Sequence, residues 1–571
     1  MKLKPFLILL IPFLVSDFHA FAAEDAPSIP TERKVLVLPV EFKNLSFTYE
    51  AEDLRALLSQ RGYSRGGAAG CVEEYFDAQL GDSLHVRFTV APKVTLLHDY
   101  AYYSVNTLSG KPVRRAEAVK EACLSSDQAV DFSIFDNIVI FYAGGSPADG
   151  CASREHLSPH SWTLSEAGIS LSLDGVPINL YSMCPELMAG SDRQAAFTGP
   201  GFLCHEYSHQ LGLLDLYDTD GADSGGKGSA LMRTTSIMDE GMFNLYGALP
   251  PNYNAIEREM LGIAKILPLT VGAHTLRPVN EDNAVYRLDA GVEGEYFLFE
   301  CRDDKGWDAG IGMNGLMVYH VDKSSNDSGC GLTAAERWKP SENKVNANIK
   351  HQCAYLIRPG ESFSYSSDPP LLPWSEKALP VALSSIKRNA DGSVSFEVCA
   401  PLNIDRADVF QDAVILQWRG SVEDGEKTLL EWEDGEGNLK KIECSPYESG
   451  CFACVVEGLM SGERYKFSVS REGGKDRTSI DVTTLFYGGY PFIRVPDVGR
   501  NPDGSYSAGA AFPLRVMNAV DVAGVEWYLD STPVSVGPDG YFHLQSSAEL
   551  KAVVRYNDGT DETLVKCLKV K

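Results

Sequence analysis

Two histidines four residues apart, His205 and His209, form the pattern with the most specific chemistry in this sequence. At that spacing on an α-helix, both imidazoles share one face and can reach a single metal ion. Glu206 lies one position further round, where its carboxylate can take a proton from water without binding the metal. The stretch CHEYSHQLGLLDLYDTD therefore predicts a zinc-hydrolase site. The structural alternative is a surface helix with two hydrogen-bonded histidines.

The residues after the second histidine extend the pattern to HExxHxxGxxD. Gly212 stands where the helix should stop, because glycine tolerates a left-handed turn. Such a turn can bring Asp215 back toward the metal as a third ligand, which leaves a fourth position for water. Asp218 and Asp220 lie close enough in sequence to be alternatives to Asp215.

Sequence signals on both sides of the histidines are typical of a buried active-site helix. Thr198 is a candidate N-cap, and Pro200 suits the first turn. Further along, TTSIMDEG places Met238 in a turn-like stretch. In metzincin-type zinc peptidases a methionine turn lies beneath the histidine ligands, so Met238 gains weight from the motif before it.

Composition limits the class of protein. The chain has 571 residues, of which 44% are hydrophobic and 23% charged, so several domains with ordinary cores are expected. Its 51 Lys and Arg residues face 78 Asp and Glu, a formal net charge of −27. Such a balance repels nucleic acid and anionic membranes and favours solubility. We therefore expect no nucleic-acid partner.

The first residues read as a secretory signal peptide. MKLKPFLILLIPFLVSDFHAFAAEDAPS has a basic start, a short apolar run and small residues that suit cleavage. No other long apolar run exists, so no membrane span is expected, and the mature chain should be extracellular or periplasmic. Export permits disulfides among the 13 cysteines, although their spacing leaves the connectivity open. Cys451 and Cys454 form an isolated C-x-x-C, for which we expect neither zinc nor a redox role.

Alternating strand and helix patterns precede the motif. KVLVLPVEF, LHVRFTVAPKVTLL and DNIVIFYAGG read as strands, and CVEEYFDAQL reads as a helix, so an α+β or α/β catalytic unit is expected to about residue 265. Beyond it the chain reads as short strands, and LMSGERYKFSV resembles the tyrosine-bearing edge of an Ig-like or fibronectin type III sandwich. The predicted order is a signal peptide (1–22), a catalytic domain (23–265), an accessory β-rich domain (266–400), a fibronectin type III-like sandwich (401–485) and an Ig-like sandwich (486–571).

Several segments, in order, resemble the immune inhibitor A family of secreted bacterial zinc metallopeptidases. The similar segments are CVEEYFDAQLGDSLHVRFTV, IVIFYAGG followed by LSPHSW, HEYSHQLGLLDLYD, SIMD, NAIEREMLG, EYFLFECRDDKGWD and GLMVYHVD. The resemblance covers about residues 34–400. It implies a metzincin-like α+β peptidase domain with an accessory antiparallel sheet. It also implies that His205, His209 and Asp215 bind zinc and that Glu206 is the catalytic carboxylate.

The chain departs from the family in two places. The family's Asp-rich, calcium-suited run before the IVIFYAGG-like strand is here FSIFDNIVIF, with Asp136 alone. The family also often carries an inhibitory propeptide, for which the short stretch between signal peptide and first strand has little room. Calcium is a second candidate cofactor in the loop DLYDTDGADSGG, through Asp218, Asp220 and Asp223, although a solvated loop explains the same residues.

The sequence thus predicts a secreted zinc endopeptidase in which Glu206 is the general base. Tyr246 and Tyr253 are candidates to stabilise the oxyanion, whereas His160 in SPHSW reads as structural. The competing hypothesis is a secreted binding or adhesion protein with an idle peptidase fold, because the terminal sandwiches suit binding of protein or glycan. The intact glutamate favours the enzyme. No G-x-S-x-G serine-hydrolase elbow is present.

Overall fold

The computed structural model describes residues 31–571, apart from 105–112, 153–155, 222–231, 330, 366, 377–378, 380, 421–426, 449, 472–476 and 497–499. The predicted signal peptide lies outside the described residues. The chain forms two compact units. The first comprises Met1–Leu269, Thr275–Glu361 and Ile386–Ser395, and the second comprises Thr270–His274, Ser362–Ser385 and Phe396–Lys571.

The first unit is built on a mixed sheet with the strand order β2–β1–β4–β8–β5. β1 pairs in parallel with β2 and β4, β4 pairs in parallel with β8, and β5 is antiparallel at the edge. Parallel neighbours need crossover connections, which here contain helices. The strands are β1 (Thr31–Glu41), β2 (Leu84–Val90), β4 (Asn137–Gly145), β5 (His160–Thr163) and β8 (Leu180–Ala189), with β3 (Val94–Thr95) beside β1 and β9 (Ala195–Phe197) beside β8.

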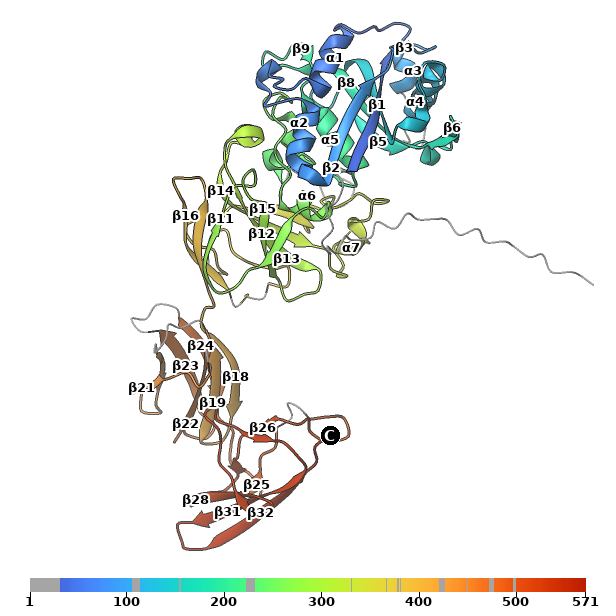
Figure 1. The fold of residues 1–571 in the computed structure, drawn as a ribbon. Helices are drawn as coiled ribbons and strands as arrows, with labels where there is room; N and C mark the ends of the chain where they lie inside the picture. Colours follow the sequence, from blue (N-terminus) through green and yellow to red (C-terminus); the bar gives the residue numbers. More distant parts are fainter. Residues whose placement is uncertain are drawn as a thin grey trace, which may run out of the picture. The chain divides into compact units, whose positions relative to one another are not determined.

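Both faces of this sheet are buried. Along β1, Val35 and Val37 belong to one core cluster, whereas Leu36, Leu38 and Val40 belong to another. Helices α1 (Ala51–Ser59), α2 (Val72–Leu80) and α5 (Pro200–Gln210) contribute to the first cluster, and α3 (Tyr100–Ser104) and α4 (Val113–Ser126) to the second (Figure 1). A largely parallel sheet with helices on both faces is an α/β arrangement. The sequence left α/β and α+β open, and the family resemblance implied α+β, so the structure favours the first of these two classes.

A second sheet in the same unit packs into the first cluster. Its order is β10–β12–β13–β14–β15, and Tyr296, Leu298, Met317 and Tyr319 from its central strands share a core with α5. The predicted accessory sheet therefore shares one hydrophobic core with the motif helix. Its elements are β10 (Lys265–Pro268), β12 (Ala284–Asp289), β13 (Glu295–Arg302), β14 (Gly315–Asp322) and β15 (Ala354–Ile357), with α6 (Ala255–Met260) and α7 (Ala334–Arg337) nearby in sequence.

Shorter elements complete the regions before residue 400. They are the strands β6 (Leu171–Leu173), β7 (Val176–Ile178), β11 (Gly272–Leu276), β16 (Ala382–Arg388) and β17 (Val394–Cys399), and the 3₁₀ helices η1 (Arg65–Gly67), η2 (Gly81–Ser83), η3 (Phe132–Ile134), η4 (Ser165–Ala167), η5 (Arg233–Thr235), η6 (Glu240–Phe243) and η7 (Gly306–Gly310). β6 pairs with β7, and β11, β17 and β16 form a three-stranded sheet.

The second unit contains a fibronectin type III-like β-sandwich. A sheet of β18–β19–β22 and a sheet of β21–β20–β23–β24 enclose one core around the fully buried Trp418. The Tyr465 hydroxyl accepts a hydrogen bond from the main-chain N–H of Met460 at 2.9 Å, which confirms the predicted tyrosine edge. The strands are β18 (Asn403–Val409), β19 (Ala413–Arg419), β20 (Thr428–Glu433), β21 (Leu439–Cys444), β22 (Cys451–Glu457), β23 (Arg464–Arg471) and β24 (Arg477–Thr483).

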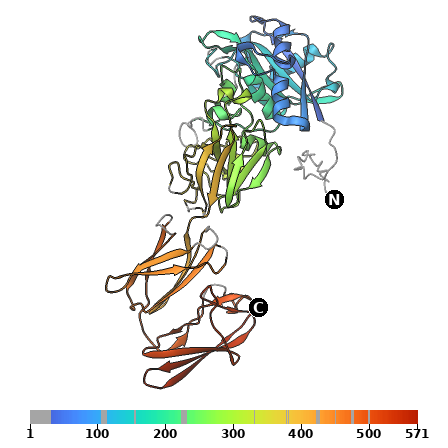
Figure 2. The ribbon, with the colours of Figure 1, turned by 60° about the vertical axis from the view of Figure 1, so that its left-hand side comes forward.

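A smaller β-sandwich follows, and its strands can be traced in Figure 2. A four-stranded sheet, β29–β28–β31–β32, shares a core with two short strand pairs, β25–β27 and β26–β30. The strands are β25 (Phe492–Ile493), β26 (Ala510–Phe512), β27 (Val516–Met517), β28 (Val522–Leu529), β29 (Thr532–Pro533), β30 (Phe542–Leu544), β31 (Ala548–Tyr556) and β32 (Asp561–Leu568).

The C-x-x-C cysteines both lie on strand β22. Side chains three apart on a strand point to opposite faces, so Cys451 and Cys454 do not face each other. Separately, among the described residues no helix has the length and apolar character needed to cross a membrane.

Close helix packing gives a first prediction. A Cβ atom on Gly201 would lie 2.0 Å from the carbonyl oxygen of Met242, whereas one on Gly360 would meet no atom within 4 Å. Gly201→Ala should therefore push α5 away from the segment that carries Met242 and destabilise the fold by about 1–3 kcal/mol. Thermal unfolding measures this, with Gly360→Ala as the matched control. Equal unfolding temperatures for the two variants would contradict the close approach.

Candidate metal centre

Helix α5 carries the predicted motif and is anchored in the main sheet. Gln210 donates hydrogen bonds from Nε2 to the carbonyl oxygen of Ile138 at 3.0 Å and to Ser182 Oγ at 2.8 Å. The helix ends after Gln210, and Gly212 has φ +106°, as the turn prediction required. The prediction of Thr198 as N-cap is wrong. Gly199 is the N-cap and Pro200 follows at the first helical position. A Cβ on Gly199 would lie 2.3 Å from the main-chain oxygen of Gly247, so this position requires glycine.

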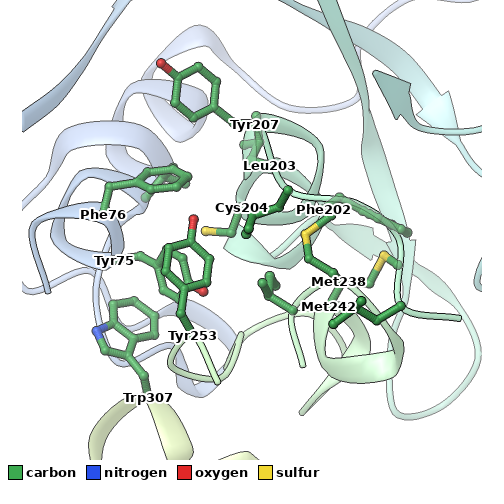
Figure 3. Close-up of a cluster of buried hydrophobic side chains, with 14 of the residues drawn as sticks. Tyr75, Phe76, Phe202, Leu203, Cys204, Tyr207, Met238, Met242, Tyr253 and Trp307 are labelled. Carbon is green, nitrogen blue, oxygen red and sulfur yellow. The ribbon is translucent and has the colours of Figure 1, made fainter. Parts of the chain in front are cut away.

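Helix α5 packs against a core of aromatic and methionine side chains. Figure 3 shows Tyr75 and Phe76 of α2 on one side of Cys204, and Met238 and Met242 on the other. All five side chains are buried, and Met238 is 0% exposed. The predicted methionine turn therefore lies against the helix that carries the histidines.

Main-chain carbonyls orient both imidazoles. His205 Nδ1 lies 2.7 Å from the oxygen of Ile237, in the methionine turn, and His209 Nδ1 lies 2.9 Å from the oxygen of Leu213. A carbonyl oxygen only accepts hydrogen bonds, so each Nδ1 carries a hydrogen. Each Nε2 is thereby directed away from its carbonyl as the atom that can bind a metal.

Asp215 meets both Nε2 atoms. Its Oδ1 lies 3.4 Å from His205 Nε2 and 3.3 Å from His209 Nε2. Tetrahedral zinc with bonds of about 2.0–2.1 Å separates its ligand atoms by about 3.3 Å. Both separations between Asp215 and the histidines therefore match the ligand spacing of one tetrahedral ion.

Two carboxylates compete for the role of third ligand. Glu206 also forms a compact group with the histidines, with ligand atoms within 4.8 Å of one another. Asp215 Oδ1 lies at tetrahedral ligand spacing from both Nε2 atoms, which favours Asp215 as the third ligand and leaves Glu206 for proton transfer. Asp218 fits less well, because its Oδ1 accepts the N–H groups of Asp220 and Gly221 within its own loop.

One buried oxygen supports a cation at this point. Glu206 Oε2 has no hydrogen-bond partner, although Glu206 is 3% exposed, whereas Asp215 Oδ1 pairs with the two imidazoles. A buried carboxylate oxygen without a donor is costly unless a positive charge compensates it. The donor set of two imidazoles and one carboxylate suits zinc and leaves one open position.

Burial and charge also set the protonation states. Burial raises the pKa of Glu206 to about 7, against the opposing effect of the His205 and His209 charges. For His209, burial favours the neutral ring, but the charge of Asp215 outweighs it and raises the pKa to about 9. Burial disfavours ionisation of Asp215, yet the His209 charge holds its pKa well below the usual range.

Glu257 holds the methionine turn, a role that the sequence did not reveal. Its Oε1 accepts hydrogen bonds from Ser236 Oγ at 2.5 Å and from the N–H of Met238 at 3.1 Å. Its Oε2 accepts the N–H of Asn254 at 2.7 Å, which closes a capping box at the start of α6. The NAIE spelling is a capping-box signal, but its partner turn could not be read from it.

The tyrosines and the histidine singled out in the sequence lie in different environments. Tyr253 is fully buried and its hydroxyl lies 2.6 Å from Ser208 Oγ, so it is engaged away from the metal ligands. Tyr246 is 53% exposed. Tyr217 was not predicted; burial and, after it, the charge of Asp215 raise its pKa well above the ordinary value. His160 lies 3.3 Å from the Tyr181 hydroxyl, in keeping with a structural role.

Only part of the predicted calcium loop is described, because Asp223 lies outside the described residues. Asp218 and Asp220 belong to a turn, and calcium there stays a prediction.

No family model and no curated protein matches the chain. Among solved structures, a two-domain fibronectin type III segment of chicken tenascin is 18% identical, covers 30% of this chain and 98% of its own, and has a TM-score of 0.13. The tandem Ig repeats of Dlar are 16% identical, with coverages of 30% and 99% and a TM-score of 0.14. A tetra-tandem repeat from a large adhesion protein is 12% identical, with coverages of 44% and 70% and a TM-score of 0.12. Scores this low carry no argument, and the sandwich fold stands on its own strand pairing.

The raised pKa of His209 predicts how metal affinity depends on pH. In the metal-free protein the His209–Asp215 pair stabilises the fold below pH 6.5, and that stabilisation is lost as pH rises through about 9. Zinc must displace the His209 proton, so zinc affinity should rise about tenfold per pH unit between pH 7 and 9. Chelator competition at several pH values measures this.

Asp215→Asn is the matched control, because it removes the charge that raises the His209 pKa. Its affinity should be lower overall and should level off nearer pH 7. A wild-type affinity that does not change between pH 7 and 9 would contradict the assignment.

Proposed function

We propose that this protein is an exported zinc-dependent endopeptidase of the immune inhibitor A type, with a metzincin-like catalytic domain. One observation supports it above the others. Asp215 Oδ1 lies at zinc-ligand distances from His205 Nε2 and His209 Nε2, beside a buried Glu206 whose Oε2 has no partner. Binding zinc alone does not require that glutamate, whereas hydrolysis does.

Zinc, when bound by these three side chains, supplies Lewis-acid chemistry, because it lowers the pKa of water and polarises a carbonyl group. Glu206 provides the proton transfers: its carboxylate accepts a proton from the attacking water and returns it to the leaving amine. In the metal-free site burial raises the pKa of Glu206 to about 7, and a bound cation would lower it and favour the carboxylate that accepts the proton. Tyr217, on which the Asp215 charge acts, replaces Tyr253 as the candidate hydrogen-bond donor to the oxyanion, because the Tyr253 hydroxyl is engaged with Ser208.

The edge strand β5 offers a binding mode for peptides. It ends the strand order of the main sheet, so one of its edges has no partner strand among the described elements. Ser161 on β5 lies 3.3 Å from Ser182 Oγ, which donates to the main-chain oxygen of Glu206 at 2.8 Å. An extended substrate can add to this edge as a further strand close to Glu206. This mode suits internal segments of a chain, hence an endopeptidase.

The rest of the chain fits an exported enzyme. We propose that the signal peptide directs export to the periplasm or the medium, and that the two sandwiches serve as spacers or bind protein or glycan. Calcium in the loop after Asp215 is a secondary part of the proposal. The alternative of an adhesion protein with an idle site has the sandwiches in its favour, and the following experiment separates the two.

Glu206→Ala should retain about one zinc per chain and lose peptide hydrolysis by about 10²–10⁴-fold or more, because it removes only the proton-transfer group. His209→Ala should lose metal and activity together, because its Nε2 is one of the three ligand atoms. The measurements are metal content and cleavage of unfolded protein and a diverse peptide library. Hydrolysis by Glu206→Ala at the wild-type rate would refute the mechanism. A zinc-loaded wild type that cleaves nothing would support the adhesion alternative.

A further inference from the structure

Asn343 lies far from the motif in sequence but next to it in the fold. It follows α7, in the loop that leads to β15, and its backbone has φ +47°. Few residues other than glycine adopt this left-handed conformation, and asparagine is the one that does so most readily. The local backbone is therefore suited to asparagine in particular.

The Asn343 side chain grips Asp215 at two points. Its Nδ2 donates to Asp215 Oδ2 at 2.7 Å, and its Oδ1 accepts the main-chain N–H of Asp215 at 3.0 Å. An N–H can only donate and an ionised carboxylate can only accept, so these partners fix which amide atom is nitrogen. The two residues are 128 positions apart.

We propose that Asn343 is a positioning residue for the metal centre: it holds Asp215 so that Oδ2 is occupied and Oδ1 faces His205 and His209. Oδ1 lies 3.4 Å and 3.3 Å from the Nε2 atoms of His205 and His209, whereas Oδ2 has its donor in Asn343, so the two oxygens have different tasks. The inference rests on the proposed zinc site. It adds a group from the accessory segment to a site that the motif places wholly in the catalytic segment.

The loop that carries Asn343 is itself fixed. Arg337, 0% exposed, donates from Nε to the carbonyl oxygen of Lys344 at 2.8 Å. Asn346 Nδ2 donates to the oxygen of Leu216 at 2.7 Å, and Thr219 Oγ1 donates to the oxygen of Asn343 at 2.8 Å. The Asn346 and Thr219 contacts join the Asn343 loop to the segment that follows Asp215, so the two segments fix each other's position.

Loss of the Asn343 amide would weaken metal binding, because the Asp215 side chain would have to be ordered when the metal binds. Without the amide, the Asp215 carboxylate can turn about its own bonds, and a metal must order it on binding. Hydrogen-bond partners behind a metal ligand typically contribute about 10–100-fold to metal affinity. A hydrogen bond from an amide also limits Asp215 to binding through one oxygen.

The test compares two variants with a neighbour in the same loop. Asn343→Gly keeps the left-handed backbone and deletes the amide, and Asn343→Asp keeps the size of the side chain but removes the donor. Both should weaken zinc binding by the folded protein about 10–100-fold, measured by chelator competition. The visible absorption of the cobalt-loaded protein should change in both. Lys344→Ala is the control, because its amine lies 4.0 Å from Asp220 and does not reach Asp215.

The possible results separate a positioning role of Asn343 from a purely structural one. Wild-type affinity and an unchanged cobalt spectrum in both Asn343 variants would overturn the inference while leaving the zinc site intact. A lower melting temperature of the metal-free variants without a change in affinity would also overturn it, because that is the result of a purely structural role. A wild type that binds no stoichiometric zinc would defeat the proposed function, and this inference with it.

Discussion

The geometry of the site depends on two hydrogen bonds from imidazole to main chain. Nδ1 of His205 is held by the carbonyl of Ile237, and Nδ1 of His209 by that of Leu213. These bonds direct both Nε2 atoms to one place, and the helix alone would not do so, because each ring could still rotate. The surrounding structure keeps the carbonyls of Ile237 and Leu213 at fixed positions relative to helix α5.

The first carbonyl belongs to the methionine turn, which is held from two sides. Glu257 accepts the Met238 N–H, and Arg302 of β13, fully buried, donates to the oxygen of Thr235 at 3.3 Å. Arg302 also forms an ion pair with Asp308 at 2.5 Å, so its charge is compensated inside the core. A buried pair of this kind contributes little net stability, but it fixes geometry because losing either partner is costly. The accessory sheet thus helps to hold the turn whose carbonyl orients His205.

Local signals predicted what depends on local spacing. HExxH on a helix and the left-handed Gly212 follow from spacing and from glycine's freedom, and strands β1, β2 and β4 were predicted from their apolar runs, whereas the central strand β8 was not. The cap at Thr198 was wrong because the helix begins one residue later, with Gly199 as the N-cap. Asn343, Glu257 and Arg302 could not be found from the sequence, since each acts through a partner remote in the chain. An asparagine in a polar stretch such as SENKVNAN carries no sign that its amide binds a carboxylate 128 residues away.

X-ray absorption at the zinc edge tests the central claim most directly, because it reports the atoms around the metal without reference to activity. The account predicts four nitrogen or oxygen neighbours at about 2.0–2.1 Å, with the outer-shell signature of two imidazoles and no sulfur. A sulfur neighbour at about 2.3 Å would place zinc on cysteines instead. That result, or a spectrum without imidazole, would contradict a centre formed by His205, His209 and Asp215.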